Sequence, residues 1–387
     1  MPDPANNAEI ANTDPTSAAV RRAWVFTDPD RSGLEVASLT VLDRMLVALH
    51  RAGYGDISVV HTDRLPLPRT RRADALGIRY VRVSSVPAGS GLVLAARAEV
   101  LVQTGDIRRL GSRPGRLAGR GGELLPIGIV EGSAGNWEAA LADLPVVPAE
   151  GVACRVRDRE EAISASRDLW NSLTSSSDGW VDRVFNRPVG RPLARWLSRT
   201  WVTPNQISVA SVLLGVVAGG MFALGQHAWL IAGALLFQLS AVLDCVDGDV
   251  ARVVFKESPL GKWLDLVGDQ VVHVSVFAGI ATGLLARDST VPAGWLGVIA
   301  VAGALLSFGV VLRGMKRSRE KGGDQRLARL LDAATNRDFS VLVLILSLAD
   351  RLEVFLWLAA VGSHLFWMML AWLQRKAWVT PDRRGVA

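Results

Sequence analysis

The sequence predicts a two-part protein: a cytoplasmic α/β domain followed by an α-helical polytopic membrane domain with six transmembrane helices. From Ile207 onward, the 387-residue chain runs in apolar blocks of roughly 20 residues, the length that a helix needs to cross a bilayer. Before about residue 200, charged and apolar residues are mixed as in a soluble domain. Apolar residues make up 50% of the chain, enough for both a core and a membrane region.

We expect residues 1–19 to be a disordered leader, because this polar stretch lacks the apolar core of a signal peptide. The soluble part should then stay in the cytoplasm. Residues 20–155 form the predicted α/β domain. The segments "RRAWVFT", "DISVV", "IRYVRV" and "EVLVQTGD" have the composition of strands, and "LTVLDRMLVALHRAGYG" has leucines at helical spacing before Gly53. Strands that alternate with a helix favour a mostly parallel sheet.

Residues 156–204 are predicted to form a linker and an interfacial amphipathic helix. The polar segment "DREEAISASRDLW" is followed by a serine cluster and then by "VDRVFNRPVGRPLARWLSRTW", in which apolar residues and arginines interleave. An ordinary surface helix would also fit this pattern. The adjacent membrane segment and the tryptophans favour a helix that lies at the lipid headgroups.

The membrane domain is predicted at residues 205–375, and residues 376–387 are predicted to be a cytoplasmic tail. Its six spans are expected at 205–225, 228–252, 261–286, 293–314, 338–351 and 353–374. A cytoplasmic N-terminus places the loops 253–260 and 315–337 in the cytoplasm, and the second loop is rich in Lys and Arg, as the positive-inside rule requires. We therefore expect a multi-pass integral membrane protein of a prokaryotic plasma membrane.

The net charge of +6 does not indicate a nucleic-acid partner. Many of the basic residues flank the apolar blocks, where they would attract anionic lipid headgroups, so membrane lipids are the expected partners. Cys154 and Cys245 are the two cysteines of the chain, which argues against a disulfide framework or a cysteine-based zinc site.

The most unusual stretch is "LDCVDGDVARVVFKESPLGKWLDLVGDQ", between two apolar runs, which includes Asp244, Asp247, Asp265 and Asp269. Since each helical residue advances by 100°, the first two share a face of the second span and the last two share a face of the third. A short loop makes these spans antiparallel neighbours, so the acidic faces can converge. Clustered carboxylates repel one another, and Mg²⁺ or Mn²⁺, which prefer oxygen ligands, would resolve the conflict. Four aspartates could hold two ions.

A simpler explanation is that these aspartates cap helices or pair with Arg252 and Lys262. One or two of them could do so. Four aspartates at this spacing, beside glycines that leave room for a ligand, favour a functional site, since intramembrane charge is costly. Neither Cys nor His clusters here, so zinc is not indicated.

The spacing Asp-x2-Asp-Gly-x2-Ala-Arg-x8-Gly-x3-Asp-x3-Asp resembles the signature of the CDP-alcohol phosphatidyltransferases, with no departure at a fixed position. Eight fixed residues, each at roughly 5–10% background frequency, would coincide by chance on the order of once in a billion start positions. The segment "TPNQIS" is also similar to the family's entry to its first transmembrane helix. The resemblance covers about residues 178–375.

This resemblance implies an enzyme that transfers the phosphoalkyl group of a CDP-alcohol, commonly CDP-diacylglycerol, to an acceptor alcohol and releases CMP, as in phospholipid biosynthesis. It implies that Asp244, Asp247 and Asp265 ligate metal. Asp269 would ligate metal or act as the general base that removes the hydroxyl proton.

The resemblance also implies a surface for the CDP group. Gly248, Ala251 and Gly261 would leave space for the cytidine, and Arg252 would hold the diphosphate by charge-assisted hydrogen bonds. Asn205 could touch the nucleotide or, equally, cap the helix that follows it.

The acceptor is not identified by the sequence, and inositol phosphate, glycerol phosphate, serine and other alcohols remain open. Lys256, Arg313, Lys316 and Arg317 could bind a phosphate on a polyol-phosphate acceptor, or could anchor the protein to anionic lipid. His273 could line the cavity, or could be a packed, hydrogen-bonded histidine. Homodimers are common in the resembled family, so a homodimer is allowed for.

The N-terminal part resembles a sugar-phosphate nucleotidyltransferase, as in the fused cytidylyltransferase and di-myo-inositol-phosphate-phosphate synthases, and "SDGWVDRVFNRPVGRPLARWL" is similar to their joining region. Such an enzyme needs a glycine-rich basic loop after its first strand, where this chain has "TDPDRSGLE". Only "TGD", ending at Asp106, resembles the metal-binding aspartate of that fold. We therefore expect a degenerate, inactive domain that serves structure, regulation or assembly.

Three functions compete on this evidence. The first is a phospholipid synthase with a lipid donor, the second is a transferase that uses a soluble CDP-polyol as in the fused family, and the third is a non-enzymatic divalent-cation transporter. The glycine, alanine and arginine positions of the motif disfavour the transporter, which has no need of them.

Overall fold

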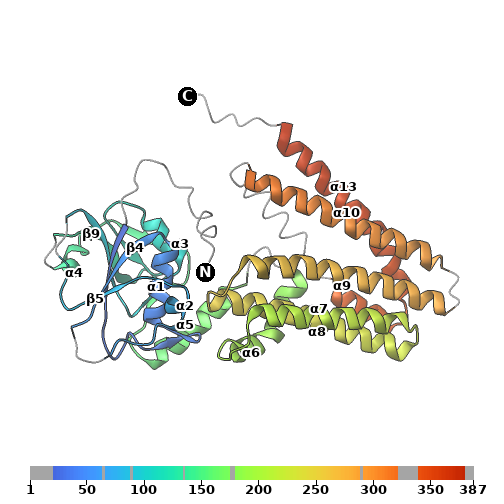
Figure 1. The fold of residues 1–387 in the computed structure, drawn as a ribbon, viewed down its shortest axis with the longest axis horizontal. Helices are drawn as coiled ribbons and strands as arrows, with labels where there is room; N and C mark the ends of the chain where they lie inside the picture. The colour runs from blue at the N-terminus through green and yellow to red at the C-terminus, as the bar shows by residue number, and fades with distance from the viewer. Residues whose placement is uncertain are drawn as a thin grey trace. The chain divides into compact units, whose positions relative to one another are not determined.

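The computed structural model describes residues 21–62, 66–87, 90–133, 136–174, 179–287, 291–320 and 339–379. The predicted leader lies outside this part of the chain, as does most of the predicted tail. The chain divides into two compact units, Met1–Leu169 and Trp170–Ala387, which are described separately here (Figure 1).

The first unit is built on a seven-stranded sheet in the order β10-β8-β9-β6-β1-β4-β5. Its strands are β1 (Arg21–Phe26), β4 (Tyr54–Val60), β5 (Val81–Val83), β6 (Leu92–Arg97), β8 (Gly115–Ala118), β9 (Leu124–Glu131) and β10 (Val146–Pro148). All neighbours run parallel except β9, which is antiparallel to both β6 and β8. The prediction of an α/β region with a mostly parallel sheet is confirmed.

Short elements complete this unit. Two small antiparallel pairs, β2 (Glu35–Val36) with β3 (Leu39–Thr40) and β7 (Val100–Leu101) with β11 (Cys154–Arg155), lie outside the main sheet. Its helices are α1 (Val41–Arg51), α2 (Arg71–Ala75), α3 (Thr104–Leu110), α4 (Trp137–Ala140) and α5 (Arg159–Asn171).

Helix α1 begins directly after its N-cap residue, Thr40. The Thr40 side chain accepts a hydrogen bond of 3.2 Å from the backbone N–H of Asp43, which satisfies a free donor of the first turn. Leu42, Leu46 and Leu49 are fully buried, as their helical spacing predicts. Leu39 instead pairs in β3, so the helix starts two residues later than its leucine pattern suggests.

Helix α5 belongs to the first unit, although residues 156–204 are predicted to be linker. Ala162, Ala165 and Leu169 lie on one side of α5 and are buried. The Ser166 hydroxyl accepts a 3.0 Å hydrogen bond from the backbone N–H of Ala37 in the β2–β3 turn. Alanine spaced along a polar helix is a weak apolar signal, so the sequence pattern alone does not assign this segment to the first unit.

The second unit is helical. Its elements are the π-helical turn η2 (Asp182–Asn186), α6 (Arg187–Leu197), α7 (Pro204–Ala223), α8 (His227–Val253), α9 (Pro259–Ala286), α10 (Ala293–Glu320), α12 (Ser340–Leu348) and α13 (Leu352–Val379). Among the described residues, five helices are long and apolar enough to cross a membrane: α7, α8, α9, α10 and α13. Five of the six predicted spans therefore correspond to a membrane-length helix.

The remaining predicted span, 338–351, is not confirmed as a membrane-length helix. Its helix α12 has 9 residues in the described part of the chain. At 1.5 Å per residue such a helix is about 14 Å long, well short of the roughly 30 Å hydrocarbon core. Phe277, Phe339 and Phe355 pack together where α9, α12 and α13 meet, so α12 is held within the bundle.

Glycines let α7 and α9 approach each other closely. A Cβ atom built on Gly279 would overlap the carbonyl oxygen of Gly219, and one on Gly283 would overlap that of Phe222. Small residues at helix crossings are the usual way to obtain van der Waals contact inside a bilayer. This contact fixes the position of α9, and with it the acidic residues that α9 carries.

Helix α6 packs along α8 with its small residues inward (Figure 1). Gly190 faces Val246, and the Gln238 side chain donates a 2.5 Å hydrogen bond to the Asn186 side chain. Val189 and Trp196 are exposed on the other side of α6, with 52% and 63% of their surface accessible. The helix is therefore amphipathic.

We predict that Gly279→Ala destabilises the protein by about 1–3 kcal/mol, because the added methyl group must push α9 away from α7. Gly220→Ala is the matched control, since no atom lies within 4 Å of its Cβ position and the residue is exposed. Thermal unfolding in detergent should show a lower Tm for the first variant and an unchanged or slightly raised Tm for the second. Equal Tm values for the two variants would contradict the close crossing.

Candidate active site

The site lies where α8 ends and α9 begins. The chain turns between them through residues 254–258, with Phe255 in the left-handed region at φ 56°. Ser258 caps α9, its hydroxyl accepting a 2.9 Å hydrogen bond from the Gly261 N–H, and Pro259 occupies the first helical turn. This short connection brings the start of α9 back to the end of α8, and both helices pack along α7.

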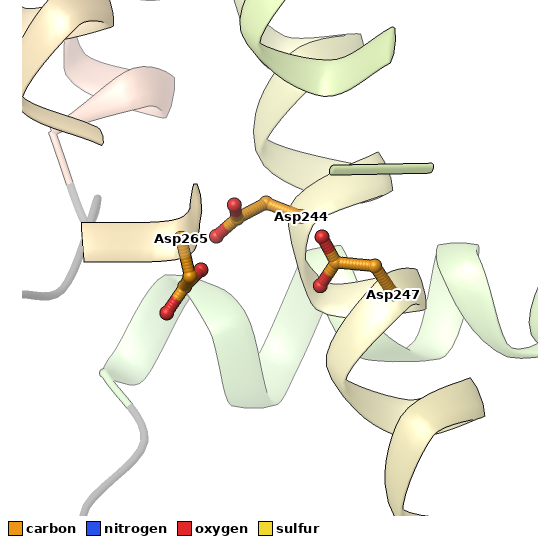
Figure 2. A group of neighbouring side chains, drawn as sticks. All are labelled: Asp244, Asp247 and Asp265. Carbon is orange, nitrogen blue, oxygen red and sulfur yellow. The ribbon is translucent and has the colours of Figure 1, made fainter. Parts of the chain in front are cut away.

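Three of the four predicted acidic residues meet. One carboxylate oxygen each from Asp244 and Asp247 of α8 and Asp265 of α9 lie within 4.8 Å of one another. Figure 2 shows the three side chains facing a common space. Asp247 is buried, Asp244 is half-buried and Asp265 is exposed, so the group opens to the outside at its α9 side.

A serine from a third helix orients the buried member of this group. The hydroxyl of Ser208 on α7 donates a hydrogen bond to Asp247 and is also within 3.1 Å of the Pro204 carbonyl oxygen. Sequence reasoning missed this residue, although it is the last residue of the "TPNQIS" segment that the family resemblance singles out. Its contact spans 39 residues of chain, which no local pattern reveals.

Asp269, the fourth predicted aspartate, is not part of the group of three. It lies one turn after Asp265 on α9 and lines a cavity with Gln270 and His273. His273 also lies in the wall of this cavity.

Two glycines of the motif lie under polar side chains. A Cβ atom on Gly248 would be 3.3 Å from an Arg252 guanidinium nitrogen, and one on Gly261 would be 3.0 Å from the Asn205 side-chain oxygen. Ala251 is half-buried on the same helix as Gly248. A larger residue at either glycine would displace the side chain above it.

Asn205 is not the helix cap, so that alternative is wrong. The N-cap of α7 is Thr203, whose hydroxyl accepts a 3.4 Å hydrogen bond from the Gln206 N–H, while the Gln206 side chain accepts a 2.9 Å bond from the Thr203 N–H. This reciprocal pair satisfies two backbone donors. The Asn205 side chain is left beside Gly261.

A fifth aspartate in the motif, Asp249, has a role that sequence reasoning missed. It is 2% exposed and forms an ion pair with Arg187 of α6, and Arg252 approaches the same carboxylate oxygen at 3.2 Å. The Arg252 side chain stays 42% exposed. Asp249 therefore holds the Arg252 guanidinium from one side and leaves the other side open.

The predicted acceptor-phosphate residues lie on two different parts of the second unit. Lys256 is half-buried just after α8, whereas Arg313 and Lys316 are exposed on α10. The side chain of Arg317 is outside the described part of the chain. None of the first three is among the described residues that line the cavity beside Asp269.

Residues 201–374 match the family model described as CDP-alcohol phosphatidyltransferase. The C-terminal part of this chain is a CDP-alcohol phosphatidyltransferase domain. The match spans all the membrane-length helices described above and the whole acidic motif, which confirms the resemblance seen in the sequence.

The domain is similar to several curated proteins. A bifunctional IPC transferase and DIPP synthase of Thermococcus kodakarensis is 32% identical over 142 residues, covering 36% of this chain and 32% of that protein. The one of Rubrobacter xylanophilus is 35% identical over 132 residues, covering 34% and 29%. The archaetidylinositol phosphate synthase of Aeropyrum pernix is 27% identical over 216 residues, covering 52% and 98%. The matches to the bifunctional proteins thus span about a third of their length.

Among solved structures, the domain is similar to the phosphatidylinositol phosphate synthase of Mycobacterium tuberculosis with CDP-DAG bound. The TM-score is 0.37 and the sequence identity 18%, with 52% of this chain and 98% of that chain covered.

We predict that Asp247→Asn and Ser208→Ala both weaken Mn²⁺ binding. Ser208→Ala should lower the affinity for Mn²⁺ by about 10–100-fold, as is usual when a hydrogen-bond partner of a metal ligand is removed. Asp247→Asn should lower this affinity further. Ser275→Ala is the matched control, because the Ser275 hydroxyl donates to the backbone carbonyl of Val271 one turn back, and the residue is half-buried on α9 and is not part of the group of three aspartates. Free Mn²⁺ can be titrated by electron paramagnetic resonance. Equal affinities for the two serine variants would remove Ser208 from the site.

Proposed function

We propose that this chain is a membrane transferase that moves the phosphoalkyl group of a CDP-alcohol to an acceptor alcohol and releases CMP, in phospholipid biosynthesis. With CDP-diacylglycerol as donor the transferred group is phosphatidyl. The observation that carries the proposal is the meeting of three carboxylates from α8 and α9 within 4.8 Å, inside a segment that matches this family.

The three carboxylates fit a divalent cation. They supply only oxygen, which Mg²⁺ and Mn²⁺ prefer, and no described His or Cys belongs to the group. Three aspartates so close together repel one another unless a cation or protons compensate them. Asp244, Asp247 and Asp265 would hold the metal, with Asp269 near enough in sequence to share a second ion. Bound there, the metal would neutralise charge on the diphosphate.

Side chains of this domain would bind the nucleotide and position it for transfer. Arg252, oriented by Asp249, would donate charge-assisted hydrogen bonds to the diphosphate. The surface over Gly248 and Gly261, with Asn205 at its edge, would receive the cytidine. These side chains fix the donor so that its β-phosphorus faces the acceptor.

Transfer then needs one bond made and one broken. The acceptor hydroxyl oxygen attacks the β-phosphorus in line, and the bond from that phosphorus to the bridging oxygen breaks, so CMP leaves with the electron pair. The hydroxyl proton goes to a carboxylate oxygen of Asp269, acting as general base. Asp269 is suited to this because it lines a cavity next to the group of three aspartates.

The topology we propose places this site at the cytoplasmic ends of α8 and α9, in a prokaryotic plasma membrane. The basic residues of the 315–337 loop support that orientation, since Lys and Arg accumulate on the cytoplasmic side. Helix α6 would lie at the headgroups, with Val189 and Trp196 in the lipid. A sixth span would include α12, and a homodimer is compatible with this arrangement.

For the N-terminal domain we propose a degenerate nucleotidyltransferase-like unit that serves structure or regulation. The Asp106 carboxylate accepts hydrogen bonds from the backbone N–H groups of Glu150 and Gly151, at 2.8 and 3.1 Å, which is a structural use. Arg97, at the end of central strand β6, is paired with Glu138 at 2.5 Å.

A second candidate is a transferase that uses a soluble CDP-polyol. Relatives named bifunctional IPC transferase and DIPP synthase, among them those of Thermococcus kodakarensis and Rubrobacter xylanophilus, favour it. A divalent-cation transporter is less well supported, because it has no need of Arg252 or of the glycines.

CMP release separates the three candidates. Membranes that contain the protein are incubated with Mn²⁺, an acceptor alcohol and either CDP-diacylglycerol or a soluble CDP-polyol. CMP together with a new lipid supports the proposed function, and CMP from the soluble donor alone supports the second candidate. Mn²⁺ flux into vesicles without CMP would support a transporter.

We predict that Asp269→Asn lowers turnover by about 10²–10⁴-fold, the usual contribution of a general base, while nucleotide affinity changes little. Asp350→Asn is the matched control, since it makes the same chemical change in an exposed ion pair with Arg287, between α12 and α13. Turnover is measured as CMP release, and affinity by displacement of a labelled nucleotide. Loss of binding with turnover retained would contradict the assignment of Asp269 as base.

We also predict that a chain lacking residues 1–169 keeps measurable transfer activity in detergent, because the acidic group and its supporting contacts lie within the second unit. The full chain, purified in parallel, is the reference. A truncated protein that is helical and monodisperse but wholly inactive would show that the first unit takes part in the reaction.

A further inference from the structure

A cavity of about 330 Å³ lies among α9, α10, α12 and α13, and Asp269 is in its wall. The volume is within the range of ordinary small-molecule sites. The residue that the proposed function assigns as general base therefore lines a partly open cavity between these helices. The acceptor hydroxyl must come to this carboxylate, so the chemistry of the cavity limits which acceptors can bind.

The walls of the cavity are mostly aromatic and aliphatic. Five phenylalanines line it, and three of them form a packed group in which the ring centres lie 5.6–6.0 Å apart. The five are Phe277, Phe308, Phe339, Phe355 and Phe366. Such a surface gains about 25 cal/mol for each Å² of apolar ligand area that it removes from water.

Two serines in the wall have hydroxyl groups that are already engaged. Ser307 donates to the backbone carbonyl of Gly303 at 2.8 Å, and Ser363 donates to that of Ala360 at 3.5 Å. Hydrogen bonds of this kind are the usual state of serine in a membrane helix. These side chains can therefore only accept hydrogen bonds from a ligand, and two acceptors are few for the several hydroxyls of a polyol.

The polar end of the cavity is formed by α9. Asp269, Gln270 and His273 lie there, and the His273 ring is 5.1 Å from the ring of Phe339. None of the described lining residues is Lys or Arg. A phosphate group in this space would face the Asp269 carboxylate without a cationic side chain from these residues, which is unfavourable in an apolar surrounding.

We propose that this cavity is the acceptor site and that the acceptor is an amphiphilic alcohol without a phosphate group. Its hydroxyl lies at Asp269, and its hydrocarbon body lies among the phenylalanine side chains. The inference rests on the proposed function and narrows the acceptor to one chemical class. It also assigns Gln270 to the polar end, where its amide can orient the hydroxyl.

The first test compares acceptors with the full-length protein in mixed micelles, with CDP-diacylglycerol and Mn²⁺. Monooleoylglycerol is the amphiphilic probe, and glycerol 3-phosphate and myo-inositol 1-phosphate are the phosphorylated ones. The expected result is CMP release and a new lipid with monooleoylglycerol only. CMP release with a phosphorylated polyol only would overturn the assignment of the cavity and leave the proposed function standing. No CMP with any acceptor or donor would instead refute the proposed function.

The second test fills the cavity. Gly362 of α13 lines it, and no atom lies within 4 Å of its Cβ position, so Gly362→Leu adds a side chain at the border of the cavity without a clash. Gly309→Leu on α10 is the matched control, because its Cβ position is equally open, the residue is exposed and it is not among the lining residues.

We expect Gly362→Leu to raise the KM for monooleoylglycerol by at least about tenfold and to leave the KM for CDP-diacylglycerol unchanged, since a misfit of a few methylene groups in an apolar site is worth 10-fold or more. Gly309→Leu should change neither value. If Gly362→Leu raises the KM for CDP-diacylglycerol instead, the cavity holds an acyl chain of the donor and the proposal is wrong. Unchanged KM values for both substrates would also overturn it.

Discussion

The repulsion among three carboxylates is the constraint on which this structure depends. Asp244, Asp247 and Asp265 approach within 4.8 Å, and one of them is buried in a helix bundle of membrane character. Such a group is costly unless a cation or protons compensate it, so the fold must supply the energy to hold it together. The close crossing of α7 and α9 at their glycines, and the packing of α6 on α8, are the contacts that do so.

The supporting contacts form a second layer around this group. Ser208 of α7 donates a hydrogen bond to Asp247 and orients its carboxylate. Arg187 of α6 forms an ion pair with Asp249, and the same Asp249 oxygen also contacts Arg252. Helices α6 and α7 thus each contribute a polar contact to the acidic motif. Such contacts set the direction in which ligands point, which is what a site needs if it is to bind a metal and a diphosphate in a fixed relation.

Much of this could be predicted from the sequence, because the information is local. Helical spacing places Asp244 and Asp247 on one face, and a short loop brings the start of α9 back to the end of α8. The buried Arg187–Asp249 pair could not be predicted, because its partners are 62 residues apart and either could have faced solvent. The predicted 338–351 span is longer than α12, since an apolar run that ends at Ala349 does not show where the helix begins and ends. Asp269 shares a face with Asp265, yet it lines the neighbouring cavity, a difference of one helical turn that only side-chain packing decides.

The central claim is that the three aspartates hold a divalent ion. Anomalous diffraction from crystals grown with Mn²⁺ tests it most directly, because the signal identifies the metal and its position together. The account predicts an anomalous peak within ligand distance of carboxylate oxygens from Asp244, Asp247 and Asp265. A protein that turns over its nucleotide substrate, but whose Mn²⁺ peak lies away from these three side chains, would contradict it.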